Sequence, residues 1–349
     1  MRKTLFVGPF PPPYMGDGIK NINLKAGFEK AGINNIIWFD TVKRDRFILN
    51  HVWCLLSFMF VARQVIFSLN KHGRYAIIPL FWMLKLFNPK KRGALYVVGG
   101  TFDLQLKREN YLYRSFFVRM VNSLDQVFVE SQVLKAGLEE CGVKRVKIVY
   151  NPRLNMGYRW NFQACEPHRI VFISRITEVK GVLDLINVVE GLNKSGFSVI
   201  ADFYGPIDEA FKDVFFERLR LCGRCCFYKG VVDPDQVQQL LCNYRLLALP
   251  TFHFGEGLPG VLVEAGMCGI PIIITRFNSL PEFFSHKENA FFIDVHDVEA
   301  LRGAIVELIS NDIIVKALSA GIKERVKPFE SKEVVFESLK YLSESGWIF

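Results

Sequence analysis

The chain has 349 residues, half of them hydrophobic and 14% aromatic, which excludes a disordered protein and supplies enough apolar material for two packed cores. Its formal charge of +9 is unevenly distributed, because residues 1–150 carry 23 Lys and Arg against 10 Asp and Glu, whereas residues 151–349 carry 21 against 25. We therefore expect an acidic partner to dock on the first half.

In the first half, short apolar runs alternate with helical patterns, which is typical of parallel α/β sheets. Strands are predicted at 4–8, 35–39, 75–80, 94–98 and 126–130. The clearest helical patterns between them lie at 18–31 and 110–122. A sixth run, 146–152, ends at Asn151-Pro152, where proline disfavours continued regular structure, so we place the domain boundary there.

One apolar run of the first half bears on membrane association. It covers 52–69, but Arg63 and Gln64 interrupt it, and its length is at the lower limit for a membrane span. It is predicted to be a buried or membrane-surface helix. A signal peptide is not expected, because the basic first residues lead into only a short apolar run before a proline cluster.

The second half repeats the alternation of strands and helices. Strands are predicted at 169–175, 198–205, 225–230, 245–250, 270–275 and 290–294, and helices at 181–194, 234–243, 259–268 and 297–309. The pattern predicts an α/β fold of two tandem Rossmann-like doubly wound domains, 1–150 and 151–330, facing a central cleft, with ligands at the carboxyl ends of the strands. The last segment, about 331–349, is predicted to be an amphipathic helix that packs back on the first domain.

Two patterns that suggest a metal are interpreted otherwise. Cys222, Cys225 and Cys226 lack the fourth ligand of a structural zinc site, and the chain's eight cysteines have no spacing typical of secreted domains, so reduced thiols are expected. The D-x-D sequence at 233–235 is interpreted as the N-cap of a helix. No metal or cofactor is expected.

The stretch HFGEGLPGVLVEAGMCGIP, 253–271, places Glu256 in the loop after a predicted strand. Pro259 suits the first position of the helix that follows, and Gly257 and Gly260 let the backbone approach a ligand closely. Amide groups at such a helix N-terminus favour an anion such as a pyrophosphate. The loop therefore predicts a site for a sugar and its phosphates.

Glu264 falls about one turn into the same helix, where a carboxylate can accept hydrogen bonds from the vicinal hydroxyls of a ribose. The alternative is that Glu256 is a solvated loop residue and Glu264 a surface position. The helix is apolar on nearly every side, which leaves little solvated face for Glu264.

Two further segments are candidates for phosphate binding. Arg175 and Lys180 follow the first strand of the second half, and together they suit the charge of a departing nucleoside diphosphate without a metal. The alternative is an exposed pair tied to Glu178. In the first half, Gly16 opens a helix after a proline-rich turn, which predicts a phosphate-side or substrate-side lip.

These pieces together resemble the large retaining glycosyltransferase family of GT-B architecture that is often called family 4. The E-x7-E pattern is met by Glu256 and Glu264, and the Arg-x4-Lys pattern by Arg175 and Lys180. VYNP at 149–152, DFYGP at 202–206 and FNSLPEFF at 277–284 are similar to further segments of that family. The resemblance covers nearly the whole chain and is strongest from about 146 to 285.

The resemblance implies a nucleoside diphosphate sugar held mainly by the second domain, with the acceptor approaching from the first. It implies that Arg175 and Lys180 contact the diphosphate, Glu256 the transferred sugar and Glu264 the ribose. The other donor-binding positions that we predict are Gly16, Gly205, Gly257, Leu258, Pro259 and Gly260. One departure is Val98, which stands where many relatives have a histidine that touches the donor sugar.

The function predicted from these observations is retaining sugar transfer onto a glycan acceptor, lipid-linked, in bacterial-type surface polysaccharide synthesis such as O-antigen, capsule or exopolysaccharide. The enzyme is expected to be cytoplasmic and peripheral on the inner face of the membrane, with the segments 42–47, 52–69 and 87–93 resting on anionic phospholipid. No nucleic-acid partner is expected. The alternatives are ordinary solubility charge for the basic half, and an epimerase, a hydrolase or a non-catalytic nucleotide-binding protein for the function.

Overall fold

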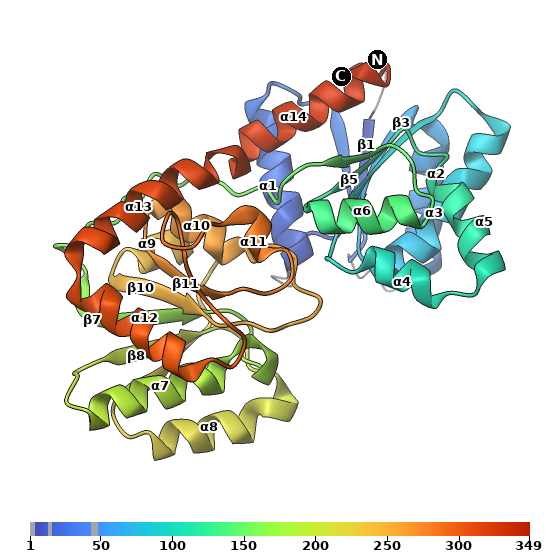
Figure 1. The fold of residues 1–349 in the computed structure, drawn as a ribbon. Coiled ribbons are helices and arrows are strands. Elements are labelled where there is room, and N and C mark those ends of the chain that lie inside the picture. The colour runs from blue at the N-terminus through green and yellow to red at the C-terminus, as the bar shows by residue number, and fades with distance from the viewer. Residues whose placement is uncertain (1–3, 13–15, 43–47) are drawn as a thin grey trace. The chain divides into compact units, whose positions relative to one another are not determined.

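The computed structural model describes residues 4–12, 16–42 and 48–349 (Figure 1). Residue contacts divide the chain into two units. Unit 1 comprises Met1–Leu154 and Phe329–Phe349, and unit 2 comprises Asn155–Pro328. The division falls four residues after the boundary expected from the sequence, and it places the last segment of the chain in unit 1.

Unit 1 contains a six-stranded parallel sheet in the order β2-β1-β3-β4-β5-β6. The strands are β1 (Thr4–Gly8), β2 (Ile36–Asp40), β3 (Gln64–Leu69), β4 (Arg92–Val97), β5 (Gln126–Val129) and β6 (Val146–Ile148). Strands β1, β3 and β5 are buried throughout, because helices cover both faces of the sheet.

The helices of unit 1 form two layers around this sheet. One layer packs with the core that contains Met59, Phe81 and Phe117, and it consists of α2 (Ile48–Val61), α3 (Lys71–Phe87), α4 (Phe102–Arg108), α5 (Tyr111–Val121) and α6 (Gln132–Glu140). The opposite layer is α1 (Gly16–Lys30) with α14 (Ser331–Glu344), which lie side by side in Figure 1 and share the core around Phe28 and Val335.

Unit 2 contains a second six-stranded parallel sheet, in the order β12-β11-β10-β7-β8-β9. Its strands are β7 (Glu166–Ile173), β8 (Ile200–Tyr204), β9 (Cys226–Gly230), β10 (Tyr244–Leu249), β11 (Ile272–Thr275) and β12 (Phe291–Ile293). The order reverses between β7 and β10, which makes this pair the topological switch point where doubly wound sheets bind ligands.

Helices of unequal length flank the sheet of unit 2. They are α7 (Val182–Lys194), α8 (Lys212–Leu221), α9 (Val237–Leu241), α10 (Gly260–Cys268), α11 (Leu280–Phe283), α12 (Val298–Ser310) and α13 (Asp312–Val326), with 3-10 turns η1 (Glu178–Lys180) and η2 (Glu209–Phe211) and, at the return to unit 1, η3 (Lys327–Phe329). Two Rossmann-like α/β units are therefore present, as the sequence predicts.

Two predictions for the first half are wrong. Residues 75–80 are not a strand but part of α3, whose N-cap Asn70 accepts a hydrogen bond from the amide of Gly73 at 3.1 Å. The run 52–69 is not one helix, because α2 ends at Val61 and 64–69 form the buried strand β3. Arg63 and Gln64 mark the change from helix to strand rather than an interruption within a helix.

The D-x-D sequence is not an N-cap either. Helix α9 begins at Val237, and the residue before it, Gln236, occupies the cap position. The amide of Gln236 donates to the carbonyl of Asp233 at 2.9 Å, so 233–236 form a turn ahead of the helix.

Candidate functional site

The two charged motifs lie on neighbouring loops at the switch point of unit 2. Arg175 and Lys180 belong to the loop after β7, and Glu256 belongs to the loop after β10. Since β7 and β10 are parallel and adjacent, their carboxyl ends meet at one edge of the sheet. Lys180 and Glu256, 76 positions apart in the sequence, are thus in direct contact.

That contact is an ion pair. The ammonium group of Lys180 donates to Oε2 of Glu256, and the two side chains are only 12% and 15% exposed. Lys180 therefore pairs with the first glutamate of the E-x7-E pattern and not with Glu178, which is exposed. A carboxylate and an ammonium held together in a shielded place suit a ligand that carries both hydroxyl groups and phosphate oxygens.

Backbone contacts hold the two loops together. The amide of Phe252 donates to the carbonyl of Val179 at 2.9 Å, and the hydroxyl of Thr251 contacts both that carbonyl and Oε2 of Glu256, at 3.3 and 3.4 Å. Gly181 has φ +72°, and a Cβ added there would lie 2.1 Å from the carbonyl oxygen of Pro250. Only glycine permits this approach, so the residue after Lys180 fixes the distance between the loops.

Gly205 connects a third loop to the same edge. It follows β8, the other neighbour of β7, and has φ +136°. A Cβ added at Gly205 would lie 1.8 Å from the carbonyl oxygen of Ser174, directly before Arg175. The predicted donor-binding glycine thus supports the backbone beneath the Arg-x4-Lys segment.

Helix α10 begins at Gly260, one residue later than predicted, and Pro259 is its N-cap rather than its first residue. Leu258 is buried and anchors the turn, while the carbonyl of Gly257 accepts from the hydroxyl of Ser279 at 3.4 Å. The helix N-terminus therefore opens at the switch point, next to Glu256.

Glu264 lies on the one face of α10 that is not packed. Within this helix only Gly260, Val261 and Glu264 are partly exposed, and the remaining residues are buried. Residues three and four apart share a helix face, so Glu264 stands one turn behind the N-terminus on the same side. The structure thus places both glutamates of the pattern around a single helix start.

Asn278 also belongs to this site, although no motif of the sequence marks it as a site residue. Its amide group donates to the carbonyls of Phe254 and Glu256, at 2.7 and 3.2 Å, from the loop after β11. Asn278 has φ +51°, a left-handed conformation that asparagine tolerates better than most residues. An asparagine in the turn between a buried strand and a Leu-Pro helix start is the sequence signal for such a residue.

The charges of Lys180, Glu256 and Arg175, the charged cluster of this site, act on His253. Burial, Lys180 and Arg175 all lower the pKa of His253, and they outweigh the opposing effect of Glu256. Arg175 is itself exposed, and its charge reaches His253. The lowered pKa favours the neutral imidazole, which can donate or accept a hydrogen bond without adding charge.

Two residues singled out from the sequence belong to unit 1. Gly16 begins α1, and among the described residues nothing lies within 4 Å of an added Cβ there. Val98 follows β4, and its carbonyl accepts from the buried guanidinium of Arg74 at 3.0 Å. Burial lowers the pKa of Arg74 to about 10, and its second bond, to the carbonyl of Leu69 at 2.8 Å, fixes the loops after β3 and β4.

Comparison with known proteins finds glycosyltransferases. Residues 161–325 match the family described as "Glycosyl transferases group 1". An uncharacterised glycosyltransferase of Methanocaldococcus jannaschii is 26% identical over 244 residues, which are 69% of this chain and 66% of that protein. An amylovoran biosynthesis glycosyltransferase of Erwinia amylovora is 22% identical over 51% of this chain and 45% of its own length.

Among solved structures, Anabaena HepE in complex with UDP and glucose covers 98% of this chain and 100% of its own, with a TM-score of 0.75 and 14% identity. At that identity the likeness concerns the fold, which is the two-domain GT-B fold. The family match lies in unit 2, where the charged cluster is found. The family match, the glycosyltransferase relatives and the fold together support a glycosyltransferase of the GT-B type.

Proposed function

We propose that this protein transfers a sugar, with retention of configuration, from a nucleoside diphosphate sugar to a glycan acceptor, as the resemblance to family 4 implies. The observation that carries the proposal is the Lys180–Glu256 pair beside the N-terminus of α10 at the switch point of unit 2. Phosphates suit the helix amides and Lys180, and sugar hydroxyls suit Glu256.

In the proposed reaction the bond between the anomeric carbon and the phosphate oxygen breaks, and a bond to the acceptor oxygen forms on the same face. The acceptor proton passes to the departing phosphate, so no nucleophile of the protein is needed. Arg175 and Lys180 balance the charge that grows on the diphosphate. This arrangement supplies cations from side chains and needs no metal or cofactor.

The test begins with a thermal-shift panel of nucleotide sugars, followed by product analysis with the donor that raises the unfolding temperature most. Transfer is supported if a new glycoside appears only when an acceptor is present. Donor turnover without an acceptor would instead favour an epimerase or a hydrolase. Nucleotide binding without any turnover would leave a non-catalytic binding protein.

Glu264→Ala is expected to weaken nucleotide binding by about tenfold, because a carboxylate that accepts from ribose hydroxyls contributes about 1.4 kcal/mol. Calorimetry with UDP or GDP measures the dissociation constant. Glu217→Ala, which removes an exposed carboxylate from helix α8 of the same unit, is the matched control and should change nothing. Equal affinities for the two variants would contradict the role of Glu264.

We further propose that the acceptor is lipid-linked, that it is a precursor of a surface polysaccharide, and that unit 1 rests on the cytoplasmic face of an anionic membrane. The Erwinia relative is named for the biosynthesis of a polysaccharide, amylovoran. Residues 51–100 hold seven Lys and Arg and no Asp or Glu. In the described part of the chain, no helix combines the length and the apolarity that a membrane crossing requires.

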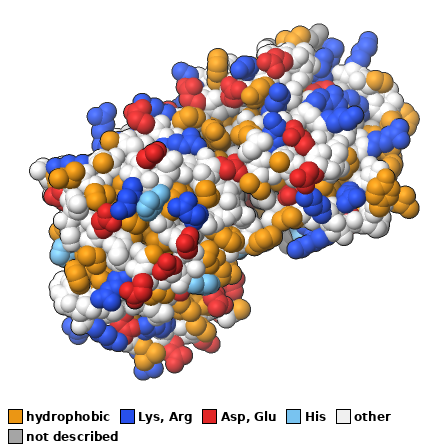
Figure 2. Space-filling model, in the orientation of Figure 1, with side chains coloured by type: hydrophobic (Ala, Val, Ile, Leu, Met, Phe, Trp, Pro, Cys, Tyr) orange, Lys and Arg blue, Asp and Glu red, His pale blue; other side chains and the backbone are white. Residues whose placement is uncertain are grey.

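The supporting surface is the outer side of α2, α3 and α5. These helices share one core layer, and ring contacts join Tyr75 to Tyr113 and Trp82 to Phe116. Figure 2 shows hydrophobic side chains beside Lys and Arg at the edge formed by α5. The apolar residues that are between 69% and 87% exposed on this surface are Trp53, Phe60, Val61, Phe87, Tyr111 and Leu112.

The segments expected to touch phospholipid are revised accordingly. Of 42–47, only Val42 lies within the described residues. Of 52–69, the part in β3 is buried and unsuited to a membrane surface. In 87–93, Lys91 is buried and donates to carbonyls at the end of α2, including that of Met59 at 2.8 Å. The exposed cations Arg63 and Lys90 remain for lipid phosphates.

The double variant Phe60→Ser/Phe87→Ser is expected to bind vesicles of phosphatidylcholine with 30% phosphatidylglycerol at least tenfold more weakly, because aromatic burial supplies about 1.5–3 kcal/mol per side chain. Co-sedimentation measures the bound fraction. Ile313→Ser, at an 80% exposed position of α13 in unit 2, is the control. The proposal would be contradicted if the unaltered protein, the double variant and Ile313→Ser bound these vesicles equally. It would also be contradicted if the unaltered protein bound vesicles of phosphatidylcholine alone as well as it binds the anionic ones.

A further inference from the structure

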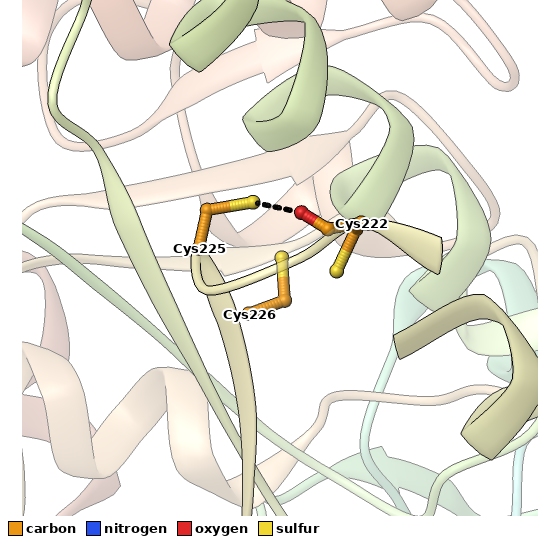
Figure 3. Close-up of side chains that lie close together, drawn as sticks. All are labelled: Cys222, Cys225 and Cys226. Carbon is orange, nitrogen blue, oxygen red and sulfur yellow. Dashed lines mark hydrogen bonds between the residues drawn. The ribbon is translucent and has the colours of Figure 1, made fainter. Parts of the chain in front are cut away.

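Three cysteines of unit 2 bring their sulfurs together outside the switch-point site. Cys222 caps the end of α8, Cys226 begins β9, and Cys225 lies directly before it. Their sulfur atoms all lie within 4.8 Å of one another, and the three residues are buried. Figure 3 shows the side chains turned toward a common space between the helix end and the strand start.

The turn between helix and strand produces this convergence. The thiol of Cys222 donates to the carbonyl of Leu219 at 3.1 Å, and the thiol of Cys225 donates to the carbonyl of Cys222 at 3.1 Å. Gly223, with φ +77°, reverses the chain between them. Gly223 and Arg224 are exposed, so the buried sulfurs lie beneath a turn at the surface.

The three thiols act on one another's pKa values in opposite directions. Hydrogen bonds from the thiol of Cys226 and from that of Cys222 lower the pKa of Cys225 to about 7, against the effect of burial. The same interactions and burial raise the pKa of Cys226, and burial raises that of Cys222. These opposed shifts have one cause, which is that the three thiols lie within reach of one another.

Two charged side chains, those of Arg218 and Glu190, lie near the three cysteines. Arg218 of α8 acts electrostatically on Cys222, and Glu190 of α7 acts on Cys225. These two residues are bound to each other, and Nε of Arg218 also donates to Asn187 at 2.9 Å. A cation among the sulfurs would offset the negative charge that Glu190 and the thiolates bring together.

We propose that Cys222, Cys225 and Cys226 bind one soft metal ion through three thiolates. Thiolate ligands select Cu(I) and Zn(II) among the common ions. Within the described residues the group holds three ligands of this kind, which suits three-coordinate Cu(I), or Zn(II) with one further ligand from solvent. Binding breaks up to three S–H bonds, releases those protons to solvent and involves no electron transfer.

The proposed metal site is independent of the proposed sugar transfer. Cys226 lies at the amino end of β9, the last strand at one side of the sheet. Lys180 and Glu256 follow the carboxyl ends of β7 and β10, whereas Cys226 lies at the amino end of its strand, so the two sites are at opposite ends of the parallel strands. Loss of the ion is therefore expected to leave the switch-point loops in place.

The experiment titrates the reduced full chain with Cu(I), without oxygen, in competition with bicinchoninate, and separately with Zn(II) in competition with a chromophoric chelator. We expect one equivalent to bind, with release of protons, and at least tenfold weaker binding by Cys226→Ser. Cys242→Ser is the matched control, because Cys242 also lies against a second thiol, that of Cys268, and among the described residues it belongs to no group of three ligands. Cys242→Ser should bind like the unaltered chain.

A second measurement covers the case in which Cys226→Ser does not fold. Bound metal should slow the alkylation of Cys225 by iodoacetamide in the unaltered protein at least tenfold, as counted by peptide mass spectrometry, and should leave the exposed Cys54 unprotected. Tight binding of either ion that depends on Cys226, or such protection, supports the proposal. Absence of stoichiometric binding by both ions, or equal binding by the Cys226 and Cys242 variants, overturns it.

Discussion

Glu256→Gln is expected to lower the rate of sugar transfer by about 10²–10³-fold while the protein remains folded. The substitution keeps the shape of the side chain but removes the negative charge that pairs with Lys180 and that we propose to contact the transferred sugar. The rate is measured as glycoside formed with the donor found by the thermal-shift panel. The unfolding temperature of the same sample shows whether the fold is kept.

Glu178→Gln is the matched control for this variant. Glu178 lies on the loop that carries Lys180, but its side chain is exposed. Its replacement should change the rate by less than about twofold, in keeping with the small contribution of exposed charges. If Glu256→Gln transferred sugar as fast as Glu178→Gln, the assignment of the first glutamate would be wrong.

Gly205→Ala is expected to lower the free energy of unfolding by about 3 kcal/mol or more. The added Cβ would lie 1.8 Å from the carbonyl oxygen of Ser174 at a φ of +136°. That carbonyl has little room to move, because the amide of Ser174 donates to Tyr204 and the amide of Ile176 to Pro206, at 3.1 and 2.9 Å. Unfolding in urea measures the change.

Gly196→Ala separates the steric contact from the backbone conformation. Gly196 also has a positive φ, +91°, but nothing lies within 4 Å of a Cβ added there. Its replacement should cost only the conformational strain, about 1 kcal/mol. If both variants lost the same stability, the contact between Gly205 and Ser174 would not be what fixes the loop after β7.

Strands β10, β11 and β12 of unit 2 are predictable from the sequence because each is a short, buried apolar run. The strand 64–69 of unit 1 is not, since the apolar run before it belongs to α2 and hydrophobicity alone does not mark where a helix gives way to a strand. The strand predicted at 75–80 is wrong for the converse reason. It is apolar and strand-like, but it continues a helix that Asn70 starts.

The charged residues of the site are predictable because their types and spacing carry the chemistry. Thr251 and Asn278 are not, because they act on backbone carbonyls, and no pattern of side chains records where a carbonyl will point. Cys222, Cys225 and Cys226 show a further limit of prediction from the sequence. The sequence shows three potential ligands, but only the turn at Gly223 brings their sulfurs together.

The packing of α14 on α1 has a consequence for biosynthesis. A Cβ added at Gly27 of α1 would lie 2.4 Å from the carbonyl oxygen of Ser331, and Trp347 is buried in the same core. Translation completes unit 2 before the ribosome reaches these last residues, so the unit begun first is finished last. A premature stop codon near position 330 would therefore expose apolar surface on the earliest-made half while leaving the later-made half intact.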